Sequence, residues 1–308
     1  MINIIGKRYY FFALSFLFIL PGLIVMAIWG LVLAIDFTGG TLLEVRFESG
    51  QLPPNAEIFK LYNDLGVSDA QIQSTGEGTI VARSSFLDDA ARAKIVSAME
   101  ARFNDKVDVL RFDSVGPTIG QEVASRAALA VGVAALAVVI YITFAFRGIQ
   151  NAFRYGICAI LAMFHDVLIV LSLGAIGAKF FGWQIDALFL TALLTVIGFS
   201  VQDKIVVFDR IRENSNIFKR LDFETLVNHS IVQTLQRSIN TQLMTVEFML
   251  LALVLFGGVT LQEFSLILLV GLFSGTYSSI FIAAPALVVW EKREWRTWFH
   301  RRPTATSA

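Results

Sequence analysis

Charged side chains stand inside otherwise apolar stretches of this sequence, and their types suit the binding and release of a proton. In the stretch 198–214, GFSVQDKIVVFDRIREN, a carboxylate and an ammonium group are adjacent. The residues of this kind are His165, Asp166, Asp203, Lys204 and Glu247, with Arg237 at the edge of another apolar stretch. A carboxylate that alternates between an arginine partner and a bound proton is a workable proton carrier, because the cation favours the ionised form.

Helical spacing indicates which of these groups meet. Residues Arg237, Asn240, Thr241 and Thr245 recur at helical intervals and form one polar stripe. If the two segments are consecutive antiparallel helices, Asp203 lies toward the same end as Arg237, and we expect the two to pair. The lysine that follows this aspartate points about 100° away from it around the helix.

The residues alone leave two interpretations of these charges open. Asp203 and Arg237 form a proton relay, or they form a structural ion pair at the headgroups, since Asp209 follows Asp203 by six residues. In the second case Lys204 extends its ammonium group to the membrane surface. A further hypothesis is that Lys204 and Glu247 offset one another, directly or through water, because each alone would be an unpaired buried charge.

The composition indicates which solvent surrounds these charges. Of the 308 residues, 56% are hydrophobic and 16% charged, and the mean hydropathy is +0.66. A typical soluble domain is about 25% charged. The apolar residues are gathered in blocks of 20 to 27 residues, interrupted only by the ionisable residues named above. A membrane-spanning helix needs about 20 mainly apolar residues, so we predict six transmembrane helices.

The expected fold class is a polytopic α-helical membrane protein: a six-helix transmembrane bundle with a small ferredoxin-like α+β external domain between helices one and two. The predicted segments are 1–35 for the N-terminus and helix one, 36–125 for the external domain, 126–147, 154–178 and 186–209 for helices two to four, 210–237 for a cytoplasmic amphipathic segment, 238–257 and 264–290 for helices five and six, and 291–308 for a basic cytoplasmic tail. Helix one is longer than the apolar region of a signal peptide, about 7–15 residues, and is predicted to be a retained anchor.

Positive charges predict the orientation of these helices. With a cytoplasmic N-terminus, Lys179 is the single lysine or arginine in the two short outer loops, whereas the inner segments contain many of these residues. Because cytoplasmic loops carry an excess of these residues, we predict that both termini are cytoplasmic and that 36–125 is external. The basic tail suits the lipids of an anionic inner leaflet, and the formal net charge of zero gives no field that points to nucleic acid.

Alternating and helical patterns divide the external domain into short elements. We predict strands at 41–47, 70–75, 79–84 and 107–115 and helices at 53–66 and 87–104. The order β-α-β-β-α-β is typical of a ferredoxin-like domain. The domain contains neither histidine nor cysteine, and we see no catalytic constellation in it.

Several motifs, in order, resemble the SecD/SecF family of the resistance-nodulation-division superfamily. They are IDFTGGTLLEV (35–45), which contains Asp36, Phe37, Thr38, Gly39 and Gly40; VGPTIG (115–120); FHDV (164–167); GFSVQDKIVVFDRIREN (198–214); TLQRSINTQL (234–243); and LFGGVTLQEFSLILLVGLFSGTYSSIFIAAP (255–285). The resemblance covers nearly the whole chain, and the fourth motif is its strongest part.

This resemblance implies a subunit that works with SecD at the SecYEG channel and assists the movement of preproteins across the prokaryotic plasma membrane, driven by proton flow. The family's helix-four acid falls on Asp203, its helix-five arginine on Arg237 and, more weakly, an acid of helix three on Asp166. Two departures stand out: Lys204 replaces a small hydroxyl residue, and Glu247 stands at a position that is usually apolar. The resemblance implies no cofactor.

Two other functions stay open beside proton-driven export. One is a stand-alone exporter of small or lipidic molecules built on the same superfamily, and the other is a passive scaffold for a protein channel. The sequence contains no recognisable nucleophile–base pair, Walker loop or metal-ligand cluster, so we do not predict an enzyme. The lone cysteine, Cys158, excludes an intrachain disulfide.

Overall fold

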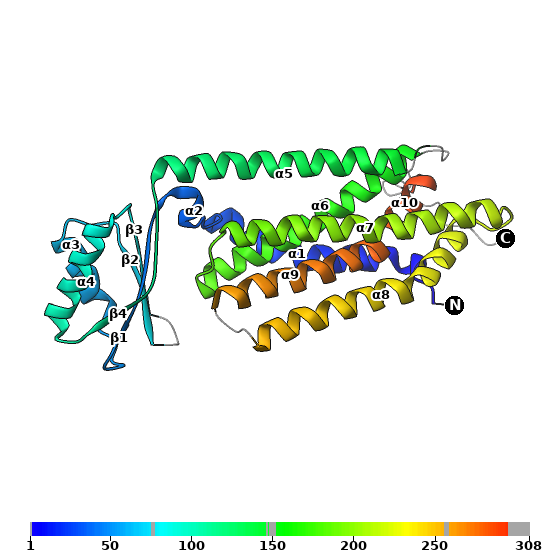
Figure 1. The fold of residues 1–308 in the computed structure, drawn as a ribbon. Coiled ribbons are helices and arrows are strands. Elements are labelled where there is room, and N and C mark those ends of the chain that lie inside the picture. The colour runs from blue at the N-terminus through cyan, green and yellow to red at the C-terminus, as the bar shows by residue number, and fades with distance from the viewer. Residues whose placement is uncertain (1, 75–77, 146, 148–151, 256–258, 295–308) are drawn as a thin grey trace, which may run out of the picture. The chain divides into compact units, whose positions relative to one another are not determined.

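The computed structural model describes residues 2–74, 78–145, 147, 152–255 and 259–294 (Figure 1). The chain divides into two compact units. One consists of Met1–Val32 together with Val131–Ala308, and the other is Leu33–Ala130. The second unit contains the sheet, and the first contains most of the long apolar helices.

The sheet unit has four antiparallel strands and two packed helices. Sheet order is β2-β3-β1-β4. The elements are β1 (Gly40–Phe47), α3 (Asn55–Asp64), β2 (Gln71–Ser74), β3 (Thr79–Ser84), α4 (Asp89–Phe103) and β4 (Val107–Val115). The predicted strands and helices are therefore confirmed within a few residues at each end, apart from residue 75, which lies outside the described residues.

The core of this unit follows from the alternation in β1. Leu43, Val45 and Phe47 point to one face and are buried against α3 and α4, which lie on that side of the sheet (Figure 1). The side chain of Asp88 caps α4 by accepting a hydrogen bond from the Ala91 amide at 2.7 Å. Asn104 ends the helix in the left-handed conformation.

Long helices make up the other unit. They are α1 (Arg8–Trp29), which follows a short 3₁₀ turn at Ile5–Lys7, the part of α5 (Pro117–Ala145) from Val131 onward, α6 (Ala152–Phe181), α7 (Ala187–Ile217), α8 (Phe223–Leu255), α9 (Val259–Ser278), a π-helical segment (Ser279–Ala283) and α10 (Ala284–Glu291). Figure 1 shows α7, α8 and α9 running side by side.

Five helices among the described residues are long and apolar enough to cross a membrane. They are Ile5–Trp29, Pro117–Ala145, Ala152–Phe181, Ala187–Ile217 and Leu261–Glu291. The sixth predicted span, 238–257, lies in α8 except for its last two residues, which fall outside the described part of the chain. Residues 210–237, predicted as a cytoplasmic amphipathic segment, form the end of α7, a short turn and the start of α8.

Two glycines of α9 let it approach α7 closely. A Cβ atom on Gly271 would lie 2.3 Å from Val196 Cγ2, and one on Gly275 would lie 3.2 Å from the Cα atom of Ser200. Larger residues at these positions would separate the helices, since helix packing in membranes depends on small residues at the contact. In this packing, Ser274 and Ser278 of α9 donate hydrogen bonds to Asp166 of α6, the residue that also contacts Lys204 of α7.

An N-terminal clamp ties the start of the chain to the start of α8. The amides of Ile4 and Ile5 donate to the Asn228 side-chain oxygen at 2.8 and 3.2 Å. The guanidinium of Arg8 pairs with Glu224 at 3.1 Å and also with Glu294. Residues from the first ten positions are thereby fixed to residues more than 200 positions later.

Candidate functional site

The site is built on the middle of α7, where two adjacent charged residues face different neighbours. Successive residues of a helix point about 100° apart, and α7 is continuous from Ala187 to Ile217. Asp203 faces α8 and the start of the π-helical segment, whereas Lys204 faces α6. The side chain of Lys204 is fully buried, so the alternative in which its ammonium reaches the membrane surface is wrong.

Two serine hydroxyls hold the carboxylate of Asp203. Ser238 Oγ donates to Oδ1 at 2.7 Å, and Ser279 Oγ donates to Oδ2. Ser238 belongs to α8 and Ser279 opens the π-helical segment, so three elements meet at this carboxylate. Hydrogen bonds to an ionised acceptor are shorter and stronger than neutral ones, and here each carboxylate oxygen accepts one from a different element.

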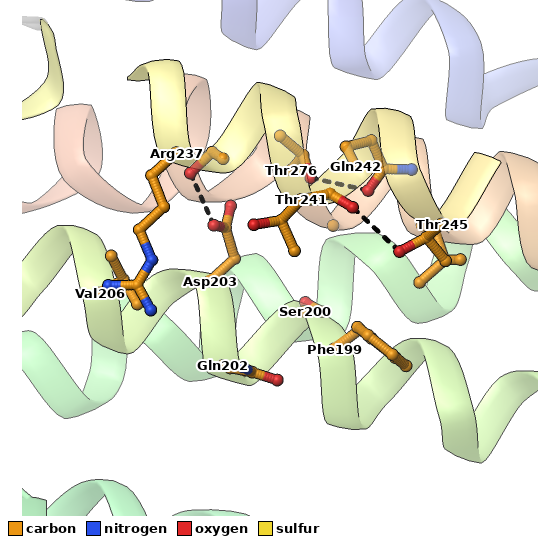
Figure 2. A pocket seen from close by; sticks show the side chains of 13 residues that line it. Phe199, Ser200, Gln202, Asp203, Val206, Arg237, Thr241, Gln242, Thr245 and Thr276 are labelled. Carbon is orange, nitrogen blue, oxygen red and sulfur yellow. Dashed lines mark hydrogen bonds between the residues drawn. The ribbon is translucent and has the colours of Figure 1, made fainter. Parts of the chain in front are cut away.

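A small polar cavity adjoins this carboxylate, and we call it the Asp203 cavity. Its volume is about 50 Å³, which exceeds the roughly 10–15 Å³ needed for one water molecule. It is lined by Phe199, Ser200, Gln202, Asp203, Val206, Arg237, Ser238, Thr241, Gln242, Thr245, Leu272, Gly275 and Thr276 (Figure 2). The polar stripe predicted on α8 contributes Arg237, Thr241 and Thr245 to this wall.

Arg237 lines the same cavity but makes no ion pair with Asp203 among the described residues, so the expected direct pair is not formed. Figure 2 shows the guanidinium beside Val206, while the Asp203 carboxylate points toward its hydroxyl partner on α8. Each carboxylate oxygen instead accepts a hydrogen bond from a serine, Ser238 or Ser279. The arginine side chain is exposed.

A second cavity of about 320 Å³ lies on the other side of Arg237. It is lined by Ile205, Val206, Asp209, Arg210, Glu213, Gln233, Thr234 and Arg237. Val206 and Arg237 line both cavities. The arginine therefore stands between the Asp203 cavity and a wider, charged cavity toward the ends of α7 and α8.

Asp166 on α6 is the ion partner of Lys204, at 2.8 Å. The hypothesis that Lys204 and Glu247 offset one another is wrong as a direct contact, because Lys204 points to α6 and Glu247 is exposed on α8. Three serines also donate to the Asp166 carboxylate, at 2.5 to 2.7 Å; they are Ser200, Ser274 and Ser278. We call Asp166, Lys204 and these serines the buried pair network.

His165 completes the surroundings of Asp166. Its Nδ1 atom lies 3.0 Å from Asp166 Oδ1, and an ionised carboxylate only accepts, so Nδ1 carries the hydrogen. Its Nε2 atom is buried and has no hydrogen-bond partner among the described residues. The ring stacks on Tyr277 of α9. His165 is thereby a packing residue that contacts Asp166 rather than Asp203.

Sequence reasoning missed the serines that organise both carboxylates. Ser238 follows Arg237 directly, and the stretch 274–279, SGTYSS, places five hydroxyl side chains in six residues of an apolar helix. Such a run was a usable signal, because hydroxyl side chains in membrane helices form hydrogen bonds between helices. What the sequence did not indicate is which carboxylate each hydroxyl faces.

The motif Asp36, Phe37, Thr38, Gly39 and Gly40 lies in the sheet unit, apart from these charges. It forms a one-turn helix, α2 (Ile35–Thr38), followed by two glycines with positive φ angles of 73° and 129°. A Cβ atom on Gly39 would lie 2.7 Å from the Cα of Pro117, and a Cβ atom on Gly40 would lie 2.7 Å from the carbonyl oxygen of Ser84. The glycines allow the chain to enter β1 directly beside the start of α5.

The described residues contain no group of three or more histidine, cysteine or acidic side chains arranged to hold a metal ion. The Asp203 cavity is lined by the carboxylate of Asp203 and by the side chain of Arg237.

Comparison with known proteins places the chain among export proteins. Residues 95–293 match the family model of the protein export membrane protein SecD/SecF, C-terminal, and residues 24–51 match the SecD/SecF GG motif. Proteins described as protein translocase subunit SecF are 71% identical in Anaerolinea thermophila and 46% identical in Thermobaculum terrenum, each over 100% of both chains.

A solved structure is also similar. The crystal structure of SecDF, a translocon-associated membrane protein from Thermus thermophilus, superposes with a TM-score of 0.81 at 33% identity. The match covers 95% of this chain and 39% of that longer chain. A SecDF protein of Bacillus subtilis is 33% identical over 94% of this chain, which is 38% of its own length.

Proposed function

The chain belongs to the SecD/SecF family of protein export membrane proteins, and on that premise we propose that it assists protein translocation across the plasma membrane, driven by ion flow past Asp203. The observation that carries this proposal is the position of the Asp203 carboxylate at the wall of a polar cavity within the helices. A half-buried carboxylate among membrane helices, without an ion-pair partner in the described chain, is suited to gaining and losing a proton.

The two adjoining cavities support a route for the ion. Val206 and Arg237 separate the Asp203 cavity from the wider cavity lined by Asp209 and Glu213. A positive guanidinium at this boundary repels a passing cation unless the side chain moves. Arg237 is therefore proposed as the gate of the route.

Asp166 is proposed as a fixed anchor rather than a carrier. Its carboxylate receives the Lys204 ammonium and three serine hydroxyls, so its bonding capacity is filled. Binding a proton there would leave Lys204 as an unpaired buried cation, which is strongly unfavourable. Of the two intramembrane aspartates, Asp203 has the environment that a carrier needs.

The membrane arrangement is part of the same proposal. We place six transmembrane helices in the chain, the fifth at 238–257 and described as part of α8 up to residue 255, with both termini cytoplasmic and residues 36–125 external. The segment 210–237, at the ends of α7 and α8, is cytoplasmic in this arrangement. The element order β-α-β-β-α-β and the sheet order β2-β3-β1-β4 support a ferredoxin-like assignment of the external domain.

The expected partners are SecD, the SecYEG channel and the translocating preprotein. Fused relatives support the first, because this chain matches only about two fifths of the SecDF proteins. The exposure of α5 also supports a partner, because nearly all of its apolar surface is left uncovered by the described residues. A helix this apolar must face lipid or another membrane protein.

The test is export of a reporter preprotein in cells that carry Asp203→Asn or Arg237→Met at wild-type membrane abundance. We expect both variants to lose the part of export that depends on a membrane potential or pH gradient. Asp222→Asn is the matched control, since this exposed carboxylate lies in the turn between α7 and α8 and lines neither cavity. Export like the wild type in both variants would overturn ion coupling and favour a passive scaffold.

Co-purification separates the remaining alternative. A stable complex with SecD at equal stoichiometry supports an export subunit, whereas a homodimer without SecD supports a stand-alone exporter of small or lipidic molecules. Replacing sodium with potassium in the export assay, at constant pH gradient, distinguishes a proton from a sodium ion as the coupling ion.

A further inference from the structure

Ser238 and Ser279 approach the Asp203 carboxylate from two different elements. Both side chains are buried, with 2% and 0% of their surface exposed. Each donates to a different carboxylate oxygen, so the carboxylate is held in one orientation. Neither serine takes part in the buried pair network around Asp166.

Ser279 stands at a distinctive point of the helix. It is the first residue of the π-helical segment Ser279–Ala283. π-Helical segments are rare in proteins, and those that occur are often found at functional sites. The preceding residue, Ser278, donates to Asp166 at 2.6 Å, so two consecutive hydroxyls serve carboxylates on two different helices.

We propose that Ser238 and Ser279 are positioning residues that hold the Asp203 carboxylate ionised and thereby set the pH at which it takes up a proton. The proposal rests on the proposed function for the role of that proton in export. Its physical basis is that a hydrogen bond to the charged form of an acid favours that form.

The charged groups near Asp203 make no direct contact with its carboxylate in the described chain. Arg237 of α8 lines the cavity without pairing with the carboxylate in the described chain, and Lys204 on the same helix is engaged by Asp166 of α6. The neighbouring residues of α9 and the π-helical segment contribute hydroxyl groups and no charge to this site. The direct contacts of the carboxylate are therefore neutral donors.

Ser279 has a second acceptor within reach. Its Oγ atom lies 2.9 Å from the Thr276 carbonyl, and a hydroxyl has a single hydrogen to donate. When a proton from water binds Asp203, the Ser279 hydrogen turns to the Thr276 carbonyl, so this serine donates to Asp203 only while the carboxylate is ionised.

The test measures protonation of Asp203 directly, by infrared difference spectroscopy of the full-length chain in complex with SecD in lipid nanodiscs. The carboxylic acid band that is absent in Asp203→Asn is assigned to this residue and followed against pH. In Ser238→Ala and in Ser279→Ala we expect the pH at half-amplitude to rise by about one unit each, which is about tenfold in proton affinity.

Matched variants separate hydrogen bonding from loss of volume. Ser279→Thr keeps the hydroxyl and is expected to restore the wild-type midpoint. Ser172→Ala is the control, because this buried serine of α6 donates to the Ile19 carbonyl, away from Asp203. If Ser279→Ala does not accumulate, Ser279→Cys is used, since a thiol has similar size but is a weak donor, and its midpoint is expected to rise as well.

An unchanged midpoint in both Ser238 and Ser279 variants would overturn the proposal. This outcome differs from a failure of the proposed function. If the serine variants shift the band but Asp203→Asn exports normally, the serines position Asp203 and ion coupling is wrong. If Asp203→Asn abolishes coupled export but the serine variants leave the band unmoved, ion coupling stands and the positioning role is wrong.

Discussion

The ammonium of Lys204 lies 2.8 Å from the carboxylate of Asp166, and both side chains are fully buried. The pair joins α7 to α6, and serines from α7 and α9 complete its hydrogen bonds. Its charges cancel, so the interior of the helices contains a neutral, fully bonded network one residue away from the half-buried Asp203. Breaking one partner of such a pair leaves the other as an uncompensated charge.

Lys204→Met is therefore expected to lower the free energy of unfolding by about 3–5 kcal/mol, because Asp166 remains buried without its counter-charge. The double variant Lys204→Met with Asp166→Asn is expected to recover much of this loss. Unfolding of the purified chain in mild detergent by added SDS measures both. A double variant no more stable than Lys204→Met would contradict the pairing.

Glu247→Gln is expected to change the free energy of unfolding of the isolated chain by less than about 0.5 kcal/mol, since exposed substitutions away from packed groups have small effects. Combined with Lys204→Met, its effect should add within about 0.5 kcal/mol, as for independent sites. The same SDS titration measures both variants. A strong coupling between the two substitutions would revive the sequence hypothesis that Lys204 and Glu247 offset one another.

Lys204 shows where sequence reasoning reached its limit. Helical periodicity correctly placed its side chain about 100° from that of Asp203. Periodicity does not say which helix lies in that direction, and α6 with Asp166 lies there rather than α8 with Glu247. The register between helices depends on close contacts such as that of Gly275 with Ser200. The spacing of Gly271 and Gly275 predicts close packing but does not say which helix they meet.

The elements themselves were predicted more fully than their contacts. The alternation in 41–47 predicted β1 because one face of the strand is buried. Asp203 and Arg237 were correctly expected near one another, since they line one cavity. Their ion pair was wrongly expected. The sequence does not indicate that the hydroxyls of Ser238 and Ser279 are the groups that bind the Asp203 carboxylate.

The stability that Glu224 contributes to the N-terminal clamp is expected to depend on pH. A hydrogen bond from Lys292, at 2.5 Å, holds the pKa of Glu224 below its ordinary value of 4.5. Since the folded pKa is the lower one, this carboxylate stabilises the clamp above its unfolded pKa, and that stability is lost as the pH falls through the folded pKa.

Glu224→Gln is accordingly expected to lower stability by about 0.5–1 kcal/mol at neutral pH. The difference from the wild type should vanish well below pH 4.5. Thermal unfolding across this pH range measures it, with Glu122→Gln, an exposed carboxylate of α5, as the control. A constant difference at every pH would show that packing, and not charge, is lost in the variant.

A stabilising substitution is expected at Tyr62 in the sheet unit. Its side chain is fully buried, and its hydroxyl has no hydrogen-bond partner among the described residues. An unsatisfied buried polar group costs about 1–3 kcal/mol, so Tyr62→Phe is expected to raise the stability of the domain by about 1 kcal/mol.

Limited proteolysis of the full-length protein during heating measures this change through the survival of residues 33–130. Tyr62→Leu serves as the comparison, since it removes ring volume from the core and should destabilise the domain. If Tyr62→Phe is cleaved at a lower temperature than the wild type, the hydroxyl has a partner, such as a bound water molecule, that supports the fold.

The N-terminal clamp also has a consequence for biosynthesis. The hydrogen bond from the Ile4 amide cannot form until the ribosome has added Asn228, 224 residues later. At about 5–20 residues per second this delay is roughly 10–45 s. During that interval the first helix resides in the membrane without its final anchor, so the newborn protein passes through a stage in which its earliest segment is open to chaperones, proteases or a premature partner.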